Sequence, residues 1–450
     1  MIRNVQLSFC DMALVDSLSS IHRRSARTAK KTDINLPYQV PTMKSQMNPL
    51  TKLLLAAFLI TSLIHVSAAD PTSSNTPVAP QAPDSTSLPN WALGPFVRPA
   101  NAQPLIQPDT NSVFDCPMRK KPMNWEATHT FNPAAVVKDG KIYLLYRAED
   151  NSSAGGIGSY TSRLGLATSE DGIHFKKEPK PVFYPAEDDQ KDYEWTGGCE
   201  DPRLTEGPDG TFYLTYTRYA RGYKNGVKLG LATSKDLRNW TKHGSPFAGT
   251  KYENQGGFKG PEKSASIVNE VKDGHLVAAK INGKYWMYFG EQSVHLASSD
   301  DLIHWVPMEN SEGKPLLVMQ PRRGFVDSLL TEVGPNALLT PKGIILFYNT
   351  KNLDPKNGGD PNFVQGVYTG TEALFDAKDP SKLITRLSTP LIKPELSWEK
   401  SGQYKEGTTF IEGLALLQGK WFLYYGCADT FVGVATSDSA LPGSGAGGQH

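Results

Sequence analysis

The chain has 450 residues, with 47 Lys plus Arg against 46 Asp plus Glu. This near balance gives no long-range field that would attract nucleic acid or an anionic membrane, so neither is expected as a partner. Aromatic residues reach 10%, which suits strand-rich proteins and also sugar binders, because flat rings cover the apolar faces of pyranose rings.

The N-terminal part contains one long apolar stretch, from Leu53 to Val66. At about 14 residues it is too short to span a bilayer comfortably, and its basic, apolar and small-residue order is typical of a secretory signal. We predict a signal peptide at residues 47–69, with Met47 as the true start, and an over-extended gene start at 1–46. The mature protein is then exported, periplasmic or secreted, without stable membrane insertion after signal cleavage. The alternatives are a buried helix and a membrane anchor.

Low-complexity segments flank the predicted folded domain. Residues 70–91 are rich in Pro, Ser and Thr and nearly lack core-forming residues, so they are predicted to be a linker. The folded domain is predicted at 92–441, followed by a Gly-rich tail at 442–450. Three cysteines cannot all pair with one another, and no Cys/His spacing resembles a zinc site. These three mature-chain cysteines are Cys116, Cys199 and Cys427.

One short phrase repeats through the predicted domain and indicates its architecture. It reads Gly165-Leu-Ala-Thr-Ser-Glu-Asp, and closely similar copies start at Gly230, His295 and Gly433. The first three copies are 65 residues apart, and the gap of 138 residues before the last leaves room for one diverged copy near Gly366. Five repeated units are therefore predicted.

An alternating aromatic strand accompanies each unit, with a shorter strand and a turn just before it. The five aromatic strands begin at Lys141, Thr211, Lys284, Gly343 and Lys420. Repeated units of three to four short antiparallel strands, without an amphipathic helix of useful length, are typical of a β-propeller. The predicted fold is all-β, a five-bladed β-propeller with an axial active-site pocket.

Polar residues stand where the first strand of several blades begins. The first strands line the central channel of a propeller, so side chains there converge although they are far apart in sequence. These positions hold Asn132, Asp201 with Arg203, Glu332, and Glu412. Burying unpaired carboxylates is costly, which makes three acids and an amide in equivalent places a poor packing solution. We interpret the set as a site; the alternative is a group of unrelated strand-cap or loop carboxylates.

Six phrases carry a resemblance to a known family. They are Phe131-Asn-Pro-Ala, Leu144-Leu-Tyr-Arg-Ala-Glu, Gly198-Cys-Glu-Asp-Pro-Arg-Leu, Lys280-Ile-Asn-Gly-Lys-Tyr, Asp301-Leu-Ile-His-Trp and Tyr425-Gly-Cys-Ala-Asp-Thr. In this order and spacing the chain resembles glycoside hydrolase family 130, the β-mannoside phosphorylases and β-mannosidases, from about Phe131 to Ser437. The resemblance implies a five-bladed propeller, an inverting mechanism and a mannose unit bound in the axial pocket.

By this resemblance Asp201 is the general acid, and in the family its proton can pass through the 3-hydroxyl of the mannose. An acid catalyst must still be protonated near neutral pH. We expect partial burial beside Glu200 to raise the pKa of Asp201, with Arg203 opposing the shift if its guanidinium is close.

Other residues match family positions near the bound sugar, among them Asn132, Arg147 and Asp429. Arg147 has an alternative structural role, which is to pair with Glu149 or Asp150. The full set of predicted substrate-binding residues is Asn132, Arg147, Glu200, Arg203, Lys272, Asp273, Glu412 and Asp429.

The choice between phosphate and water as the nucleophile rests on one stretch. Phosphorylases of the family carry a His-Arg pair there that helps hold phosphate, whereas this chain reads Phe289-Gly-Glu291. Glu291 would repel an anion, while a water needs a carboxylate to remove its proton. Glu291 and Glu332 match two glutamates of the family's hydrolases, and either can be the base. Lys272-Asp273 still resembles the Lys-Asp of the phosphorylases.

The sequence thus predicts an inverting, exo-acting β-mannosidase with Asp201, Glu291 and Glu332 as catalytic residues and no metal or other cofactor. Its substrate is a β-mannoside oligosaccharide or glycan, with β-1,2 linkages favoured. The main alternative is a β-mannoside phosphorylase releasing mannose 1-phosphate, which export disfavours because phosphorolysis conserves a sugar phosphate best used inside the cell. A propeller hydrolase of arabinan or fructan and a non-catalytic glycan-binding propeller are the further alternatives.

Overall fold

The computed structural model describes residues 87–152, 157–222, 226–253 and 263–444. The predicted gene extension, the signal peptide, most of the linker (70–86) and residues 445–450 of the tail lie outside the described residues. Within the described ranges, regular structure is almost entirely β, as predicted, and no helix is long and apolar enough to cross a membrane. The helical segments are α2 (Lys191–Glu194), η2 (Pro355–Asn357) and η3 (Ser397–Glu399).

In the described ranges, strands β3 to β25 form five antiparallel groups, each built on one of the predicted aromatic segments. The first two groups are β3 (His129–Lys138), β4 (Lys141–Glu149), β5 (Ser162–Ser169), β6 (Lys176–Lys177), and β7 (Gly198–Glu206), β8 (Phe212–Ala220), β9 (Gly226–Ser234), β10 (Thr241–Gly244). The third is β11 (Ala265–Lys272), β12 (His275–Ala278), β13 (Lys280–Ile281), β14 (Lys284–Phe289), β15 (Val294–Ser299), β16 (Trp305–Pro307) and β17 (Leu317–Met319). The last two are β18 (Leu330–Val333), β19 (Ala337–Thr340), β20 (Gly343–Lys351), β21 (Tyr368–Phe375), β22 (Leu383–Arg386), and β23 (Thr409–Leu417), β24 (Lys420–Cys427), β25 (Phe431–Ser437).

The repeated phrase ends a strand and encodes the turn that follows it. In three copies the closing serine caps the turn: its Oγ accepts a hydrogen bond from the backbone N–H three residues later, at 2.8 to 2.9 Å. The carboxylate two residues after that serine accepts from the next backbone N–H groups, as Asp301 does from Ile303 and His304. Serine and aspartate favour such turns because their short side chains reach the local backbone. The phrase therefore recurs for a structural reason.

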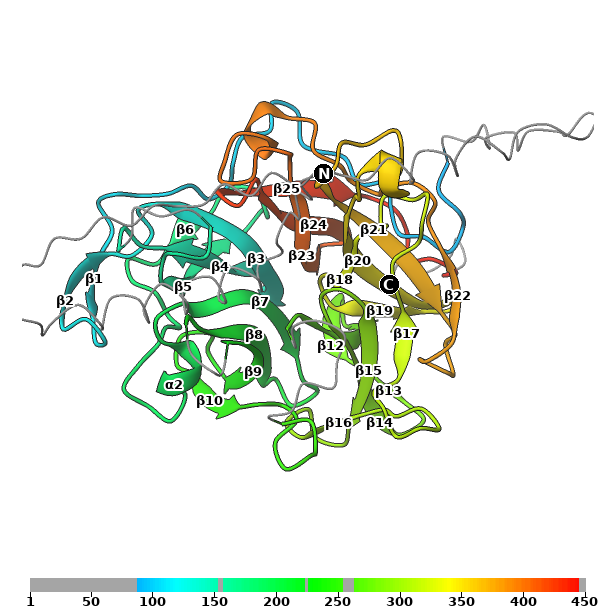
Figure 1. Cartoon of the computed structure of the whole chain (residues 1–450), viewed down its shortest axis with the longest axis horizontal. Helices are drawn as coiled ribbons and strands as arrows, with labels where there is room; N and C mark the ends of the chain where they lie inside the picture. The colour runs from blue at the N-terminus through cyan, green and yellow to red at the C-terminus, as the bar shows by residue number, and fades with distance from the viewer. Residues whose placement is uncertain (1–86, 153–156, 223–225, 254–262, 445–450) are drawn as a thin grey trace, which may run out of the picture. The chain divides into compact units, whose positions relative to one another are not determined.

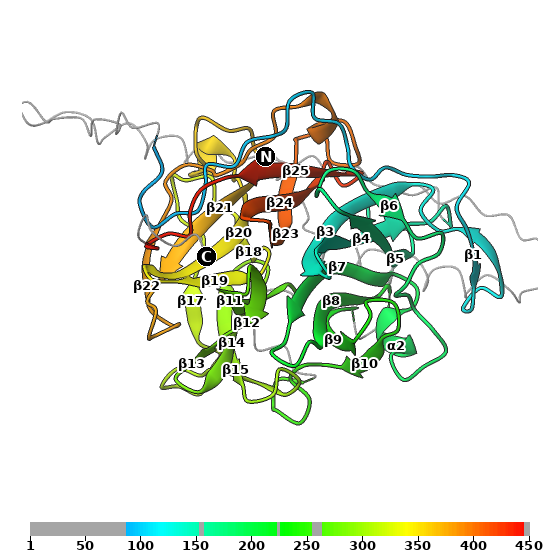
Figure 2. The same ribbon diagram turned by 180° about the vertical axis from the view of Figure 1, so that it is seen from behind.

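The groups adjoin one another, and their first strands are in contact: β3 contacts β7 and β23, and β11 contacts β7 and β19. Parallel pairings join Ser162 of β5 to Gly198 of β7, and Val268 of β11 to Ala337 of β19. Figures 1 and 2 show β23, β24 and β25 between the β3–β5 strands and the β18–β21 strands from both sides. The first strands of the groups therefore lie close together, as the sequence predicts for the site residues.

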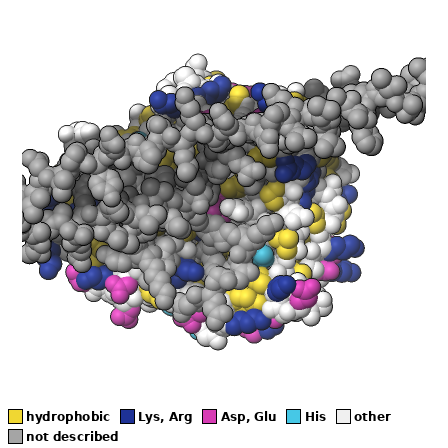
Figure 3. All heavy atoms as spheres, viewed as in Figure 1, with side chains coloured by type: hydrophobic (Ala, Val, Ile, Leu, Met, Phe, Trp, Pro, Cys, Tyr) yellow, Lys and Arg dark blue, Asp and Glu magenta, His cyan; other side chains and the backbone are white. Residues whose placement is uncertain are grey.

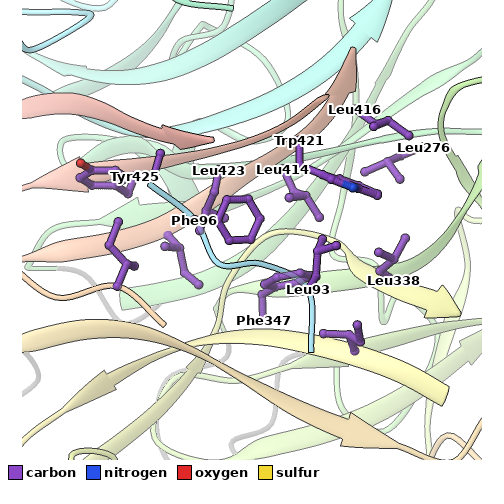
Figure 4. Close-up of a cluster of buried hydrophobic side chains, with 14 of the residues drawn as sticks. Leu93, Phe96, Leu276, Leu338, Phe347, Leu414, Leu416, Trp421, Leu423 and Tyr425 are labelled. Atoms are coloured by element: carbon purple, nitrogen blue, oxygen red, sulfur yellow. The ribbon is translucent and has the colours of Figure 1, made fainter. Parts of the chain in front are cut away.

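The segment before β1 packs on the fifth group. Single antiparallel bridges pair Val97 with Thr436 and Ile106 with Val432, so the segment runs along β25. Leu93 and Phe96 are buried against β23 and β24, as the close-up in Figure 4 shows. A hairpin of β1 (Val113–Cys116) and β2 (Lys121–Asn124) follows. N- and C-terminal parts of the predicted domain thus share one core.

Charge is mixed on the described surface. Figure 3 shows Lys and Arg side chains beside Asp and Glu side chains along its lower edge. The described cysteines, Cys116, Cys199 and Cys427, are buried free thiols.

Candidate active site

Bulges in three first strands point the predicted polar residues away from the hydrogen-bond ladder. The register shifts at Asn132 in β3, at Asp201 in β7 and at Glu412 in β23. Asn132 and Asp201 also have positive φ angles of 47° and 46°, which non-glycine residues seldom adopt. A bulge re-aims a side chain and is often found beside an active site. The repeated irregularity brings residues from distant strands together.

Asp201 is buried and held through both carboxylate oxygens. Its Oδ1 accepts hydrogen bonds from Asn132 Nδ2 at 2.9 Å and from Arg147 Nη1 at 3.0 Å. Its Oδ2 lies 3.7 Å from Lys263 Nζ. Asn132 fits because Gly426 stands opposite: a Cβ there would lie 2.1 Å from Asn132 Oδ1.

Arg147 holds three carboxylates on this side of the site. Besides Asp201, its Nη2 contacts Glu149 at 2.7 Å and Glu200 at 2.8 Å. Ser162 completes the cluster, because its Oγ accepts from Arg147 Nε at 3.1 Å and donates to Glu200 at 3.0 Å. Arg147 therefore combines the pairing with Glu149 that the sequence offered as an alternative with a direct contact to Asp201.

Arg203 lies beneath Asp201 rather than beside its carboxylate. Its guanidinium donates to the backbone oxygens of Asp201 at 3.0 Å and of Val333 at 2.9 Å. It also forms a buried ion pair with Glu412, at 2.8 Å. Arg203 and Glu412 thus tie three first strands together below the acid, where burial raises the pKa of Glu412 well above its ordinary value.

Lys263 joins the predicted catalytic carboxylates, and the sequence analysis missed it. Its Nζ lies 3.3 Å from Glu291 Oε1, 3.4 Å from Glu332 Oε1 and 3.7 Å from Asp201 Oδ2. Ser264 donates a hydrogen bond of 2.5 Å to Glu332. The predicted polar residues belong to the first strands of four groups, and Lys263 stands two residues before β11, the first strand of the remaining group.

The backbone is closely packed at Phe289-Gly-Glu291, the stretch on which the choice between phosphate and water depends. Phe289 ends β14 and is buried, with its ring centroid 4.9 Å from that of Phe247. Gly290 has a φ of 125°, and a Cβ on it would lie 2.1 Å from the backbone oxygen of Ser293. This backbone therefore leaves no room for a side chain at position 290, and Glu291 follows directly beside Lys263.

Two predicted residues lie away from this cluster. Lys272 and Asp273 are exposed at the turn between β11 and β12. A strand rises about 3.3 Å per residue, so Lys272 lies about 23 Å along β11 from Ala265, the end next to Lys263. The structure does not bring these two residues together with Asp201.

Asp429 lies at the turn between β24 and β25. Burial raises its pKa to about 6, against the opposing charges of Arg147, Lys263 and Lys351. Lys351, at the end of β20, has its Nζ 4.8 Å from the ring centroid of Tyr368 and 5.3 Å from that of Tyr404. The charges of Glu291 and Asp429 act on its ammonium, so Lys351 is a second missed lysine near the site.

The protonation of Asp201 differs from the sequence expectation. Burial raises its pKa, but the charges of Arg147, Lys263 and Arg203 lower it by more, so the pKa falls below the ordinary range. The expected upward shift is therefore wrong, because Arg147 and Lys263 both contact the carboxylate.

Two neighbouring glutamates shift in the other direction. Burial raises the pKa of Glu200 to about 7, with Arg147 opposing. Burial likewise raises the pKa of Glu332 to about 7, with Lys263 opposing. These two groups, rather than Asp201, hold protons near neutral pH.

The arrangement suits acid–base chemistry on a neutral substrate. Asp201 faces Glu291 and Glu332 across Lys263, and pairs of carboxyl groups whose pKa values are pushed apart are typical of acid–base sites. No group of three or more His, Cys, Asp or Glu side chains in the described ranges is arranged to hold a metal ion.

Comparison with known proteins gives the family. A family model described as beta-1,4-mannooligosaccharide phosphorylase matches residues 98–440, most of the chain. The chain belongs to glycoside hydrolase family 130. It is therefore an enzyme of glycoside chemistry, as the sequence predicted.

Relatives within family 130 include both activities considered above. A 1,2-beta-oligomannan phosphorylase of Thermoanaerobacter sp. (strain X514) is 34% identical over 320 residues, covering 71% of this chain and 93% of the relative. A solved glycosyl hydrolase from Bacteroides ovatus is 50% identical, with a TM-score of 0.75 and coverage of 79% and 97%. Another solved structure comes from work describing family 130 glycoside hydrolases that target beta-1,2 mannosidic linkages in Candida mannan. It is 50% identical, with a TM-score of 0.74 and coverage of 79% and 99%.

Proposed function

We propose that this family 130 member is an inverting, exo-acting β-mannosidase that hydrolyses β-1,2-mannosidic linkages and releases mannose. The higher identity to solved hydrolase structures, 50% against 34% for the oligomannan phosphorylase, supports hydrolysis. The β-1,2 linkage is supported by two of these relatives, one a hydrolase structure and one a phosphorylase.

The observation that carries the proposal is that the cationic side chains around Asp201 already contact carboxylates of the protein. Lys263 contacts three carboxylates, Arg147 contacts three, and Arg203 is paired with Glu412. A phosphate placed near Glu291 would meet a repulsion on the order of 4 kcal/mol for close charges at an effective dielectric near 20. Water meets no such barrier and needs a carboxylate as base. The crowded backbone at Gly290 further disfavours the family's cationic pair.

In the proposed mechanism the general acid and the general base lie on different sides of Lys263. Asp201 protonates the leaving group, directly or through the mannose 3-hydroxyl, while Glu291 or Glu332 removes a proton from water on the opposite face of the sugar. Asp201 has a lowered pKa before substrate binds, whereas Glu332 holds a proton near pH 7. Substrate binding must therefore move one proton to Asp201. A sugar hydroxyl that hydrogen-bonds to Asp201 in place of Lys263, whose Nζ lies 3.7 Å away, would weaken the contact that keeps the acid ionised.

The proposal also includes the architecture and the location of the enzyme. Five antiparallel groups whose first strands are in contact support a five-bladed propeller whose axial pocket holds the mannose. The apolar run from Leu53 to Val66 supports export.

Product analysis tests the proposal. Purified enzyme is incubated with β-1,2-mannobiose and with a β-1,4-mannosyl substrate, each with and without phosphate, and products are identified by NMR. We expect free α-mannose as the first product from the β-1,2 substrate, at a rate that phosphate does not raise. Initial β-mannose would contradict inversion, and preference for the β-1,4 substrate would contradict the linkage.

A phosphorylase is the second candidate, favoured by one observation. Lys351 lies against two tyrosine rings and has no carboxylate within ion-pair distance among the described residues. Together with Lys263 it could hold a phosphate. Accumulation of mannose 1-phosphate in phosphate buffer would establish this activity in place of hydrolysis.

A further inference from the structure

Two arginines stack on aromatic rings on the acid side of the site. Arg119 Cζ lies 5.1 Å from the ring centroid of Trp195, and Arg221 Cζ lies 5.9 Å from that of Tyr219. All four side chains are partly exposed. We call these four residues the arginine–aromatic wall. Nothing in the acid–base chemistry described above uses it.

One short segment joins the wall to the acid. Arg119 Nη2 donates to Thr161 Oγ1 at 3.2 Å, and Arg221 Nη2 donates to the backbone oxygen of Tyr160. The next residue, Ser162, contacts both Arg147 and Glu200. The two guanidiniums therefore contact Thr161 and Tyr160, which stand one and two residues before Ser162 of the cluster that holds Asp201.

The wall has hydrogen-bonding capacity that the protein does not use. In the described part of the chain, neither Arg119 nor Arg221 has a carboxylate within 4 Å, in contrast to Arg147 and Arg203. The Nε atoms of both are buried and have no acceptor among described residues. A guanidinium has five N–H donors, and the contacts above use one Nη of each arginine, so Nη donors are left for a ligand.

The position of the wall indicates which part of a substrate it meets. In an inverting glycosidase the general acid lies on the side of the leaving group and the base on the opposite side. Arg147, Glu200 and the wall lie on the side of Asp201, whereas Lys263 separates Asp201 from Glu291 and Glu332. A leaving sugar on the side of Asp201 would extend towards the wall.

We propose that the arginine–aromatic wall binds the mannosyl residues on the leaving-group side of an oligosaccharide. Trp195 and Tyr219 cover apolar sugar faces, and Arg119 and Arg221 donate hydrogen bonds to sugar hydroxyls. This assignment rests on the proposed function, because it takes Asp201 as the acid.

Kinetics with two kinds of substrate test the assignment. β-1,2-Mannotriose presents leaving-side sugars to the wall, whereas β-mannosyl fluoride has a single-atom leaving group. For Trp195→Ala and Arg119→Met we expect kcat/KM for the trisaccharide to fall at least tenfold, mainly through KM, and kcat/KM for the fluoride to stay within twofold. Trp195→Phe and Arg119→Lys should recover part of the loss. Arg238→Met, a change to an exposed arginine paired with Glu178, is the matched control and should alter neither value.

Equal losses on both substrates would overturn the assignment, because they would indicate a structural role, and so would no loss on either. A binding measurement separates this result from the proposed function. Calorimetric titration of β-1,2-mannotriose into Asp201→Asn, with and without Trp195→Ala, should show at least tenfold weaker binding for the double variant. If the parent enzyme cleaves no β-mannoside, the proposed function fails. Weaker binding in the double variant would then still support the wall, and unchanged binding would overturn it.

Discussion

Arg147 and Lys263 each contact three carboxylates, and both contact Asp201, yet the two clusters differ in geometry. The contacts of Arg147 are direct hydrogen bonds of 2.7 to 3.0 Å. Those of Lys263 span 3.3 to 3.7 Å. A planar guanidinium offers five donors in a fixed fork, whereas an ammonium is a compact charge on a flexible stem.

This difference indicates how the two clusters divide the work. The Arg147 cluster fixes one oxygen of Asp201 and keeps the acid in place. The Lys263 cluster makes longer contacts, between the other oxygen of the acid and the two candidate bases, and we expect a sugar hydroxyl and a water to displace these contacts more easily. We call the Arg147 cluster the tight side, which positions the acid. We call the Lys263 cluster the loose side or loose cluster, which contains the groups that exchange protons.

Removing the group shared by both clusters should have the largest effect. Asp201→Asn keeps the shape of the side chain but cannot supply a proton, so turnover on β-1,2-mannobiose should fall roughly 100-fold or more. Substrate binding and the melting temperature should change little. Steady-state kinetics and thermal unfolding measure both, and near-wild-type turnover would remove Asp201 from the role of acid.

The next effect should come from the two candidate bases on the loose side. Glu291→Gln and Glu332→Gln should each lower hydrolysis, the true base by roughly 100-fold, while mannose binding persists. Azide should restore the rate only for the base, if a small anion can occupy the vacated water site. Equal and slight losses in both variants would show that neither glutamate activates water.

Neutralising Lys263 should act mainly on the loose cluster. Lys263→Ala removes the charge that lowers the pKa values of Asp201 and Glu332, so both values should rise. We expect roughly tenfold slower turnover, the order set by about one unit of pKa change. Methylammonium should restore part of the rate, whereas tetramethylammonium should not. Unchanged kinetics would make Lys263 a bystander.

The pH dependence should report the proton that the loose cluster shares. Asp201 and Glu332 together must hold one proton for the reaction, and in the free enzyme Glu332 holds it with a pKa of about 7. As pH rises through about 7 this proton is lost, so kcat/KM should fall, approaching tenfold per pH unit. A kcat/KM that keeps rising from pH 7 to 9 would contradict this assignment.

Residues outside both clusters should have the smallest effect. Lys272→Ala changes an exposed turn at the far end of β11, so turnover and phosphate dependence should stay within twofold of wild type. The same kinetic assay measures it. A marked loss would mean that the Lys272-Asp273 pair acts at the site through a route that the described contacts do not contain.

Much of the fold was predictable because its signals are local. The aromatic alternation of Lys141–Glu149 and the serine–aspartate turns follow from strand periodicity and from short side chains that bond to the nearby backbone. The site was predictable in part for the same reason: the first strands begin with polar residues in four groups, and Asn132, Asp201 and Glu332 do lie close together.

The sequence by itself determined the strands, the repeat and the acids, since each is written in a few neighbouring residues. Tertiary structure alone decided which charges face one another. Lys263 stands in no motif, and it reaches Asp201, Glu291 and Glu332 only because three groups of strands adjoin. Lys263 also lowers the pKa of Asp201, which burial alone would raise. The packing of the strands leaves Lys272 outside the site. Charge interactions depend on distance and burial, and neither is fixed until distant strands are packed together.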